Sequence, residues 1–117
     1  MNIIVCGAGR VGYSISSQLS KQGHSITVID KLGADIQKIN DNLDARGIVG
    51  IATFPSVLEK ADAKNADMII AVTRNDETNM VVCQIAHSLF NIPRKIARIR
   101  SKEFLKPPKV GILLVPV

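Results

Sequence analysis

The chain has 117 residues, which suits one compact domain, and 46% of them are hydrophobic against 21% charged, which excludes a disordered protein. Its core must be aliphatic, because only three phenylalanines and one tyrosine are aromatic, and this favours strands buried on both faces. The formal charge of +5 is concentrated between Arg94 and Lys109, where seven basic residues stand against Glu103 alone. Without aromatic side chains to stack on bases, this segment indicates a local anion site or a partner surface, and we expect no nucleic-acid partner.

The two cysteines, Cys6 and Cys83, lie in apolar segments far apart in the sequence, with no Cys-x-x-Cys pair and no histidine at metal-ligand spacing. We therefore expect buried thiols in a cytosolic protein, without a disulfide and without a metal site. The N-terminus lacks a charged leader and a cleavage site, so no signal peptide is expected. No apolar run approaches the ~20 residues needed to cross a bilayer, so we expect no direct membrane insertion.

Short apolar runs bounded by turn signals predict five strands, at residues 3–6, 26–29, 48–49, 68–72 and 96–99. Between these runs, apolar residues recur at helical spacing, which gives each predicted helix one face to lay on a sheet. The three stripes are Val11, Ile15 and Leu19; Ile36, Ile39 and Leu43; and Val81, Ile85 and Leu89. Residues that typically end or begin helices fit these predictions. Gly23 follows the first helix, Pro55 suits the first turn of a short third helix, and Asp76 can cap the fourth.

Strict alternation of strands and helices predicts parallel strands joined by right-handed crossovers. The expected fold is a Rossmann-type, doubly wound parallel sheet between two helix layers, whose ligand crevice lies at the carboxyl ends of the strands. We assign residues 1–106 to this single domain. Residues 107–117 form an apolar tail, interpreted as a short sixth strand or the end of a truncated product, and Lys106, Pro107 and Pro108 break any helix before it.

A glycine-rich turn follows the first predicted strand and opens the first predicted helix, which is the context that makes a G-x-G-x-x-G match informative. Gly7 permits the tight turn, Gly9 lets the backbone approach a pyrophosphate, and Gly12 allows close packing of helix on strand. Free N–H groups and the helix dipole then bind phosphate. The predicted binding turn consists of Gly7, Ala8, Gly9, Arg10, Val11 and Gly12.

Asp30 closes the second predicted strand, where a carboxylate accepts hydrogen bonds from an adenosine ribose and repels a 2′-phosphate. This favours NAD(H) or an adenine mononucleotide over NADP(H), an inference that the neighbouring Lys31 weakens. Arg10 occupies a variable position of the turn. Its side chain either contacts a terminal phosphate or a partner's ligand, or it is a plain surface arginine.

Further candidate residues follow the fourth and fifth predicted strands. Thr73 and Arg74 begin where the fourth strand ends, beside the same crevice. Arg98 and Arg100 share one face of the fifth strand by its period of two, so they reach phosphate or line a subunit interface. For His24 and His87 the sequence identifies no nucleophile or acid as a catalytic partner, so we interpret both as surface or capping residues and predict no catalytic residue.

The chain resembles the N-terminal nucleotide-binding domains (KTN or RCK domains, TrkA-N) of potassium-transport regulators, including the cytoplasmic NAD-binding regulatory subunit of the Trk potassium-uptake system. The resemblance covers residues 1 to about 104. The stretches that carry it are IIVCGAGRVG (3–12), ITVID (26–30), VLEKA (57–61), ADMIIAVT (66–73), DETNM (76–80), SLFN (88–91) and IARIRS (96–101).

The resemblance implies a regulatory subunit that is not an enzyme, binds NAD(H), or ATP or ADP as in related proteins, and controls a membrane potassium-transporter pore subunit. It implies a homo-oligomer that is cytoplasmic and peripheral at the inner face of the cell membrane. By the same resemblance the nucleotide touches the turn, Asp30, the loop near Ile51, Thr73 with Arg74, and Arg98. Many relatives have an acidic or polar residue at the place of Ile51, so that contact is backbone or apolar here.

Two other functions compete with a regulatory module. One is the cofactor domain of an NAD-dependent oxidoreductase without its catalytic domain; a short-chain reductase is excluded, because its Tyr-x-x-x-Lys pair is missing and Ser17 stands four residues after Tyr13. The other is a DNA-binding redox sensor, supported only by the basic segment. We favour the regulatory module, which needs only a difference in nucleotide affinity between two shapes.

Overall fold

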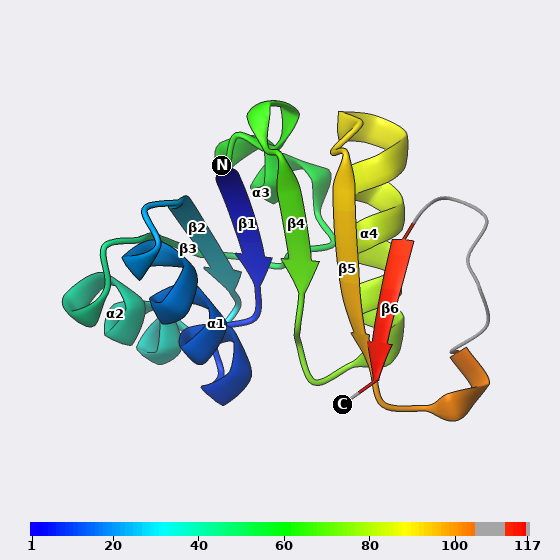
Figure 1. The fold of residues 1–117 in the computed structure, drawn as a ribbon, viewed down its shortest axis with the longest axis horizontal. Coiled ribbons are helices and arrows are strands. Elements are labelled where there is room, and N and C mark those ends of the chain that lie inside the picture. Colours follow the sequence, from blue (N-terminus) through cyan, green and yellow to red (C-terminus); the bar gives the residue numbers. More distant parts are fainter. Residues whose placement is uncertain (105–111, 117) are drawn as a thin grey trace.

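The computed structural model describes residues 1–104 and 112–116. Its centre is a single sheet of six strands in the order β3-β2-β1-β4-β5-β6, and every neighbouring pair is parallel (Figure 1). The strands are β1 (Asn2–Cys6), β2 (Ser25–Asp30), β3 (Arg46–Val49), β4 (Met68–Ala71), β5 (Arg94–Ile99) and β6 (Ile112–Pro116). The doubly wound parallel sheet expected from the sequence is therefore confirmed.

The helices form two layers: one layer covers one face over one half of the sheet, and the other layer covers the opposite face over the other half (Figure 1). The elements are α1 (Arg10–Lys21), α2 (Gly33–Asn42), α3 (Pro55–Lys60), α4 (Asp76–Phe90) and the short 3-10 helices η1 (Ala63–Asn65) and η2 (Lys102–Phe104). Residues of α1 and α2 pack with Ile3 and Val5 of β1, whereas residues of α3 and α4 pack with Ile4 and Cys6. Successive side chains of a strand point to opposite faces of the sheet, so one apolar run packs against both helix layers.

The strand predictions are correct in number and place for the first five strands, although the observed strands differ at their ends. In addition, residues 112–116 pair with β5 along its length, from Lys95 opposite Ile112 to Ile99 opposite Pro116. The helix break expected at Lys106, Pro107 and Pro108 lies outside the described residues.

The predicted stripe on α4 is wrong. Val81 and Leu89 are 45% and 58% exposed, and Ile85 is only partly buried. The face turned to the sheet instead consists of Asn79, Val82, Cys83 and Ala86. It meets Ala71 and Ala97 of the sheet in the same core cluster. On α4, therefore, the small residues Cys83 and Ala86 are more buried than the larger Val81, Ile85 and Leu89.

Replacing Val82 by alanine should lower the free energy of unfolding by about 2 kcal/mol, since two buried methyl groups are lost. Replacing Val81 should cost nothing, because its side chain already contacts water. Both changes gain the same helix propensity, so the pair isolates burial. Urea unfolding of the two variants provides the measurement, and equal losses would contradict the observed orientation of α4.

Two of the predicted helix boundaries are confirmed and one is wrong. Gly23 has a φ of 89° just after α1, and Pro55 is the first residue of α3. The cap of α4, however, is Asn75, whose side chain accepts a hydrogen bond from Thr78 N at 2.7 Å. Asp76 is the first helical residue, and its carboxylate has a different role, described below.

Both cysteines are free and buried, as predicted. Burial raises the pKa of each thiol, that of Cys83 to about 12, so both remain protonated and unreactive at neutral pH. Within residues 1–104 and 112–116, no helix combines the length and the apolar character needed to cross a membrane.

Candidate functional site

The turn between β1 and α1 is held by packing that only glycine permits at two positions. Gly7 has a φ of +114°, and its N–H donates to Ile29 O at 2.8 Å. A Cβ atom on Gly7 would lie 2.9 Å from the carbonyl carbon and oxygen of Val72, and one on Gly12 would lie 1.7 Å from Gly7 O. The protein's own backbone therefore requires glycine at both positions.

Gly9 is different, because the protein's own packing does not require it to be glycine. Its φ is −71°, and a Cβ atom placed there would meet no atom within 4 Å. The space in front of Gly9 is thus open, as a turn that admits a ligand close to its backbone requires.

The N-terminus of α1 opens onto this space without any compensating group. Gly9, the N-cap, supplies no side-chain hydrogen bond, and the first turn contains no acidic residue. The first backbone bond of the helix runs from Tyr13 N to Gly9 O at 2.8 Å, so the N–H groups before Tyr13 have no partner within the helix. These donors and the positive end of the helix dipole favour an anion.

Asp30, the last residue of β2, lies against the same turn. Its Oδ2 accepts a hydrogen bond from Ala8 N at 2.7 Å, and its Oδ1 accepts one from Leu32 N at 2.8 Å. A carboxylate has about four lone-pair sites, so each oxygen can accept a further hydrogen bond. The carboxylate therefore orients the turn and retains the capacity to bind two ribose hydroxyl groups.

The other predicted residues near the turn lie on the same edge of the sheet. Arg10, Lys31 and Ile51 are exposed, Ile51 to 45%. Gly50 N donates to Asp30 O at 2.9 Å, which holds the start of the Ile51 loop beside the end of β2. No side-chain hydrogen bond of Arg10 or Lys31 is seen among the described residues.

The loop after β4 joins this edge from the other side. Val72 N donates to Cys6 O at 2.8 Å, so Thr73 and Arg74 follow directly beside the turn. Thr73 is half-buried, and its Oγ1 donates to Asn79 Oδ1 at 2.6 Å, while Arg74 is exposed. A hollow lined by Gly23, His24 and Arg46 lies instead at the amino ends of the strands, and no predicted site residue lines it.

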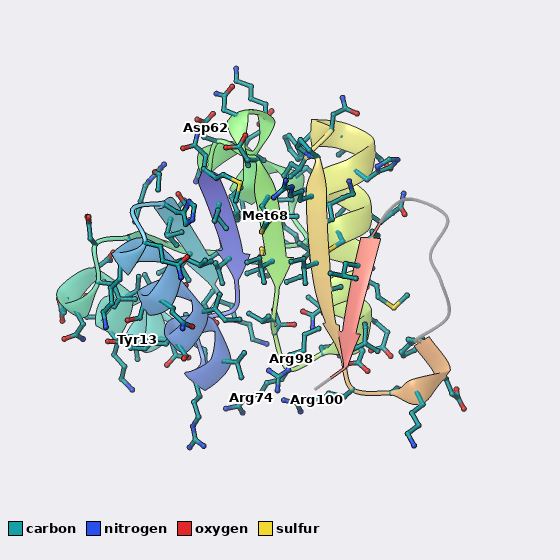
Figure 2. The ribbon with its side chains drawn as sticks, in the orientation of Figure 1. Tyr13, Asp62, Met68, Arg74, Arg98 and Arg100 are labelled. Atoms are coloured by element: carbon teal, nitrogen blue, oxygen red, sulfur yellow. The ribbon has the colours of Figure 1, made fainter. Side chains whose placement is uncertain are left out.

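Arg98 is half-buried near the end of β5, and its Nε has no hydrogen-bond partner among the described residues. Burial lowers the pKa of its guanidinium, Arg100 lowers it further, and Asp76 opposes both. Arg98 and Arg100 are expected to share one face of the fifth strand; β5 ends at Ile99, so Arg100 lies just beyond it. Figure 2 shows Arg74, Arg98 and Arg100 in one region at the carboxyl ends of β4 and β5.

The Asp76 carboxylate holds the chain after β5. It accepts hydrogen bonds from the backbone N–H groups of Arg100 at 2.9 Å and Ser101 at 2.8 Å. These two bonds are the main reason that its pKa is lowered from 3.8, and the charges of Arg100 and Arg98 lower it as well. The first turn of α4 and the end of β5 are thereby joined.

Because the folded-state pKa of Asp76 lies below the unfolded value, its ionised form stabilises the fold above that value, and the effect is lost as pH falls through the folded pKa. We expect the difference in unfolding free energy between wild type and Asp76→Asn to be constant above about pH 5 and to shrink below about pH 4. Urea unfolding across this range measures it. A difference independent of pH would show that the carboxylate charge plays no part.

Sequence reasoning gave no role to Asn79, although a signal was present. Asn79, Val82, Cys83 and Ala86 follow the spacing i, i+3, i+4, i+7 of a buried helix face, and Asn79 is its one strongly polar member. A polar residue on such a face needs hydrogen-bond partners inside the protein.

The strand order changes direction between β1 and β4, and the glycine turn and the strand-end carboxylate lie at that point. This combination defines the chain as a Rossmann-type α/β domain. More narrowly, the chain belongs to the TrkA-N domain family, whose model matches residues 3–110. The family expected from the sequence is therefore confirmed.

Curated relatives of high similarity carry the name Trk system potassium uptake protein TrkA. The protein from Azorhizobium caulinodans is 47% identical over 107 residues, which are 92% of this chain and 23% of that protein. The one from Vibrio alginolyticus is 45% identical over 105 residues, 90% of this chain and 23% of that protein. The chain thus spans about a quarter of the length of these relatives, whose name is that of a transport protein and not of an enzyme.

Solved structures share the fold at lower identity. The NAD(P)-binding domain of an exopolyphosphatase-related protein from Archaeoglobus fulgidus has a TM-score of 0.83 at 22% identity, covering 99% of this chain and 87% of that one. The GsuK channel bound to NAD has a TM-score of 0.81 at 20% identity, covering 98% and 21% of the two chains. GsuK bound to ADP has a TM-score of 0.80 at 20% identity, covering 98% and 31%.

Proposed function

We propose that this chain is a regulatory domain of a potassium uptake system and that it binds an adenine nucleotide, NAD(H) or alternatively ATP or ADP. The observation that carries the proposal is the open space at Gly9, faced by unpaired N–H groups of α1 and flanked by the Asp30 carboxylate. Phosphate fits the first of these features and ribose the second. The NAD and ADP complexes of GsuK, which shares this fold, support the choice of ligand.

In this proposal the phosphates lie on residues 7–12 and the ribose on Asp30, with Lys31 and Ile51 beside the adenosine. Thr73, Arg74 and Arg98 face the other end of the ligand. The domain acts on a membrane potassium-transporter pore subunit, as part of a homo-oligomer at the inner face of the cell membrane. The name of the curated relatives supports the transport system, and regulation requires only that the nucleotide bind two conformations unequally.

Thermal unfolding of the purified chain with NADH, NAD, ATP, ADP and NADPH tests the ligand. A nucleotide at 100 times its dissociation constant adds ~2.7 kcal/mol, which raises the midpoint of a domain this size by roughly 10 °C. NADPH should raise it least, because its 2′-phosphate meets the Asp30 carboxylate. No shift with any nucleotide would refute binding, and hydride transfer to a small carbonyl substrate would refute a purely regulatory role.

Potassium uptake by cells that depend on the transport system containing this chain tests the regulatory part. A substitution that removes nucleotide binding without unfolding the domain should change the uptake rate or its dependence on cellular nucleotide levels. Uptake identical to wild type would show that nucleotide binding has no regulatory effect.

A further inference from the structure

Asn79 is fully buried on the sheet-facing side of α4 and uses its entire hydrogen-bonding capacity. Its Oδ1 accepts bonds from Thr73 N at 2.9 Å and Thr73 Oγ1 at 2.6 Å. Its Nδ2 donates to Thr73 O at 3.1 Å and Arg98 O at 2.8 Å. An amide has two acceptor and two donor sites, and all four are filled. The backbone N–H of Thr73 faces the oxygen, which fixes the amide orientation.

These contacts connect three elements that are distant in sequence. Thr73 follows β4, Arg98 lies in β5, and Asn79 belongs to the first turns of α4. Asp76, one turn earlier on α4, adds the two bonds to the backbone after β5. A fully satisfied buried network of this kind is rigid, so the ends of β4 and β5 move together with the start of α4.

The unit held in this way carries the basic side chains beside the crevice. Arg74 follows Thr73. The carbonyl of Arg98 accepts a hydrogen bond from Asn79, and the backbone N–H of Arg100 donates one to Asp76. Figure 2 shows these three arginines in one region, at the carboxyl ends of β4 and β5. Arg98 Nε is buried and has no hydrogen-bond partner among the described residues, so the protein leaves this donor of the guanidinium unused.

We propose that Asn79 is the positioning residue for the basic half of the nucleotide crevice. It holds the backbone at Thr73 and Arg98 so that the side chains of Arg74 and Arg98 bind the terminal phosphate of ADP or ATP, while residues 7–12 bind the phosphate nearest the ribose and Asp30 binds the ribose. This inference rests on the nucleotide binding proposed above and adds what the second half of the crevice recognises: a phosphate beyond the first.

Calorimetric titration with adenosine, AMP, ADP and ATP tests the inference. Wild type should gain affinity from AMP to ADP, and Asn79→Ala should reduce this gain by about tenfold while AMP affinity stays within about twofold. Asn79→Asp is the second variant: it keeps the two acceptor contacts with Thr73, replaces both donors by carboxylate oxygen, and should also reduce the gain. Val82→Ala, on the same helix face, is the control, which loses stability but keeps the wild-type ratio of ADP to AMP affinity.

The outcomes separate this inference from the proposed function. If the Asn79 variants weaken AMP and ADP by the same factor, or retain the full gain, the residue does not position the basic half. If wild type binds AMP and ADP equally, the basic half holds no phosphate, although nucleotide binding itself stands. Failure of wild type to bind any nucleotide overturns the proposed function, and this inference with it.

Discussion

Replacing Gly12 by alanine should strongly destabilise the domain, whereas replacing Gly9 should leave it folded and weaken nucleotide binding. The Cβ atom added at Gly12 would lie 1.7 Å from Gly7 O and 2.6 Å from Gly7 C. Both are backbone atoms of Gly7, whose N–H donates to Ile29 O, so neither can move without a large energetic cost. We expect a loss above about 4 kcal/mol, a large part of the 5–15 kcal/mol that stabilises a typical domain.

Gly9 contrasts with Gly12 because an added methyl group meets no protein atom within 4 Å and the φ of −71° suits alanine. Stability should therefore be unchanged or rise by about 0.5 kcal/mol. The same methyl group occupies the space that the phosphates need, so affinity should fall at least about tenfold. Far-UV circular dichroism melting and calorimetric titration together measure both effects.

Gly33→Ala provides the matched control for this pair of variants. Gly33 begins α2, and a Cβ atom there also meets nothing within 4 Å. This variant should fold and bind like wild type. A Gly9→Ala protein that binds nucleotide as tightly as Gly33→Ala would contradict the placement of the ligand at the turn.

Replacing Asp30 by alanine should reduce both stability and nucleotide affinity. The fold loses the acceptor for Ala8 N and Leu32 N. Hydrogen bonds to charged groups contribute about 1.5–3 kcal/mol each, but one of these two is exposed to solvent and the other only partly buried, so we expect a smaller total loss of about 2–4 kcal/mol. The ligand loses its ribose acceptor, which should weaken binding at least about tenfold. Chemical denaturation and titration with NADH provide the two values.

Asp30→Asn separates charge from hydrogen bonding at this position. It keeps the size and one acceptor oxygen but removes the negative charge, so the ratio of NADPH to NADH affinity should rise towards one. If Asp30→Ala binds nucleotide as tightly as wild type, Asp30 is not part of the site. If Asp30→Asn keeps the wild-type ratio of NADPH to NADH affinity, the charge of Asp30 does not select the ligand.

Local patterns predicted the elements well where a strand or helix depends on its own residues. The buried runs of β1 and β4, the start of α3 at Pro55 and the stop at Gly23 follow from hydrophobic period and turn chemistry, and the structure confirms them. Spacing alone failed on α4. Val81 and Leu89 match a four-residue repeat, yet they are exposed, and the face with Cys83 and Ala86 packs into the core instead.

The sequence by itself determined the alternation of strands and helices, the glycine turn and the strand-end position of Asp30, because hydrophobic period and backbone sterics act over a few residues. Only the tertiary structure decided the strand order, the buried face of α4, and the contacts that bring Asp76 to Arg100 and Asn79 to both Thr73 and Arg98. Those contacts depend on parallel strands ending at one edge, where residues 6 to 24 positions apart become hydrogen-bond partners.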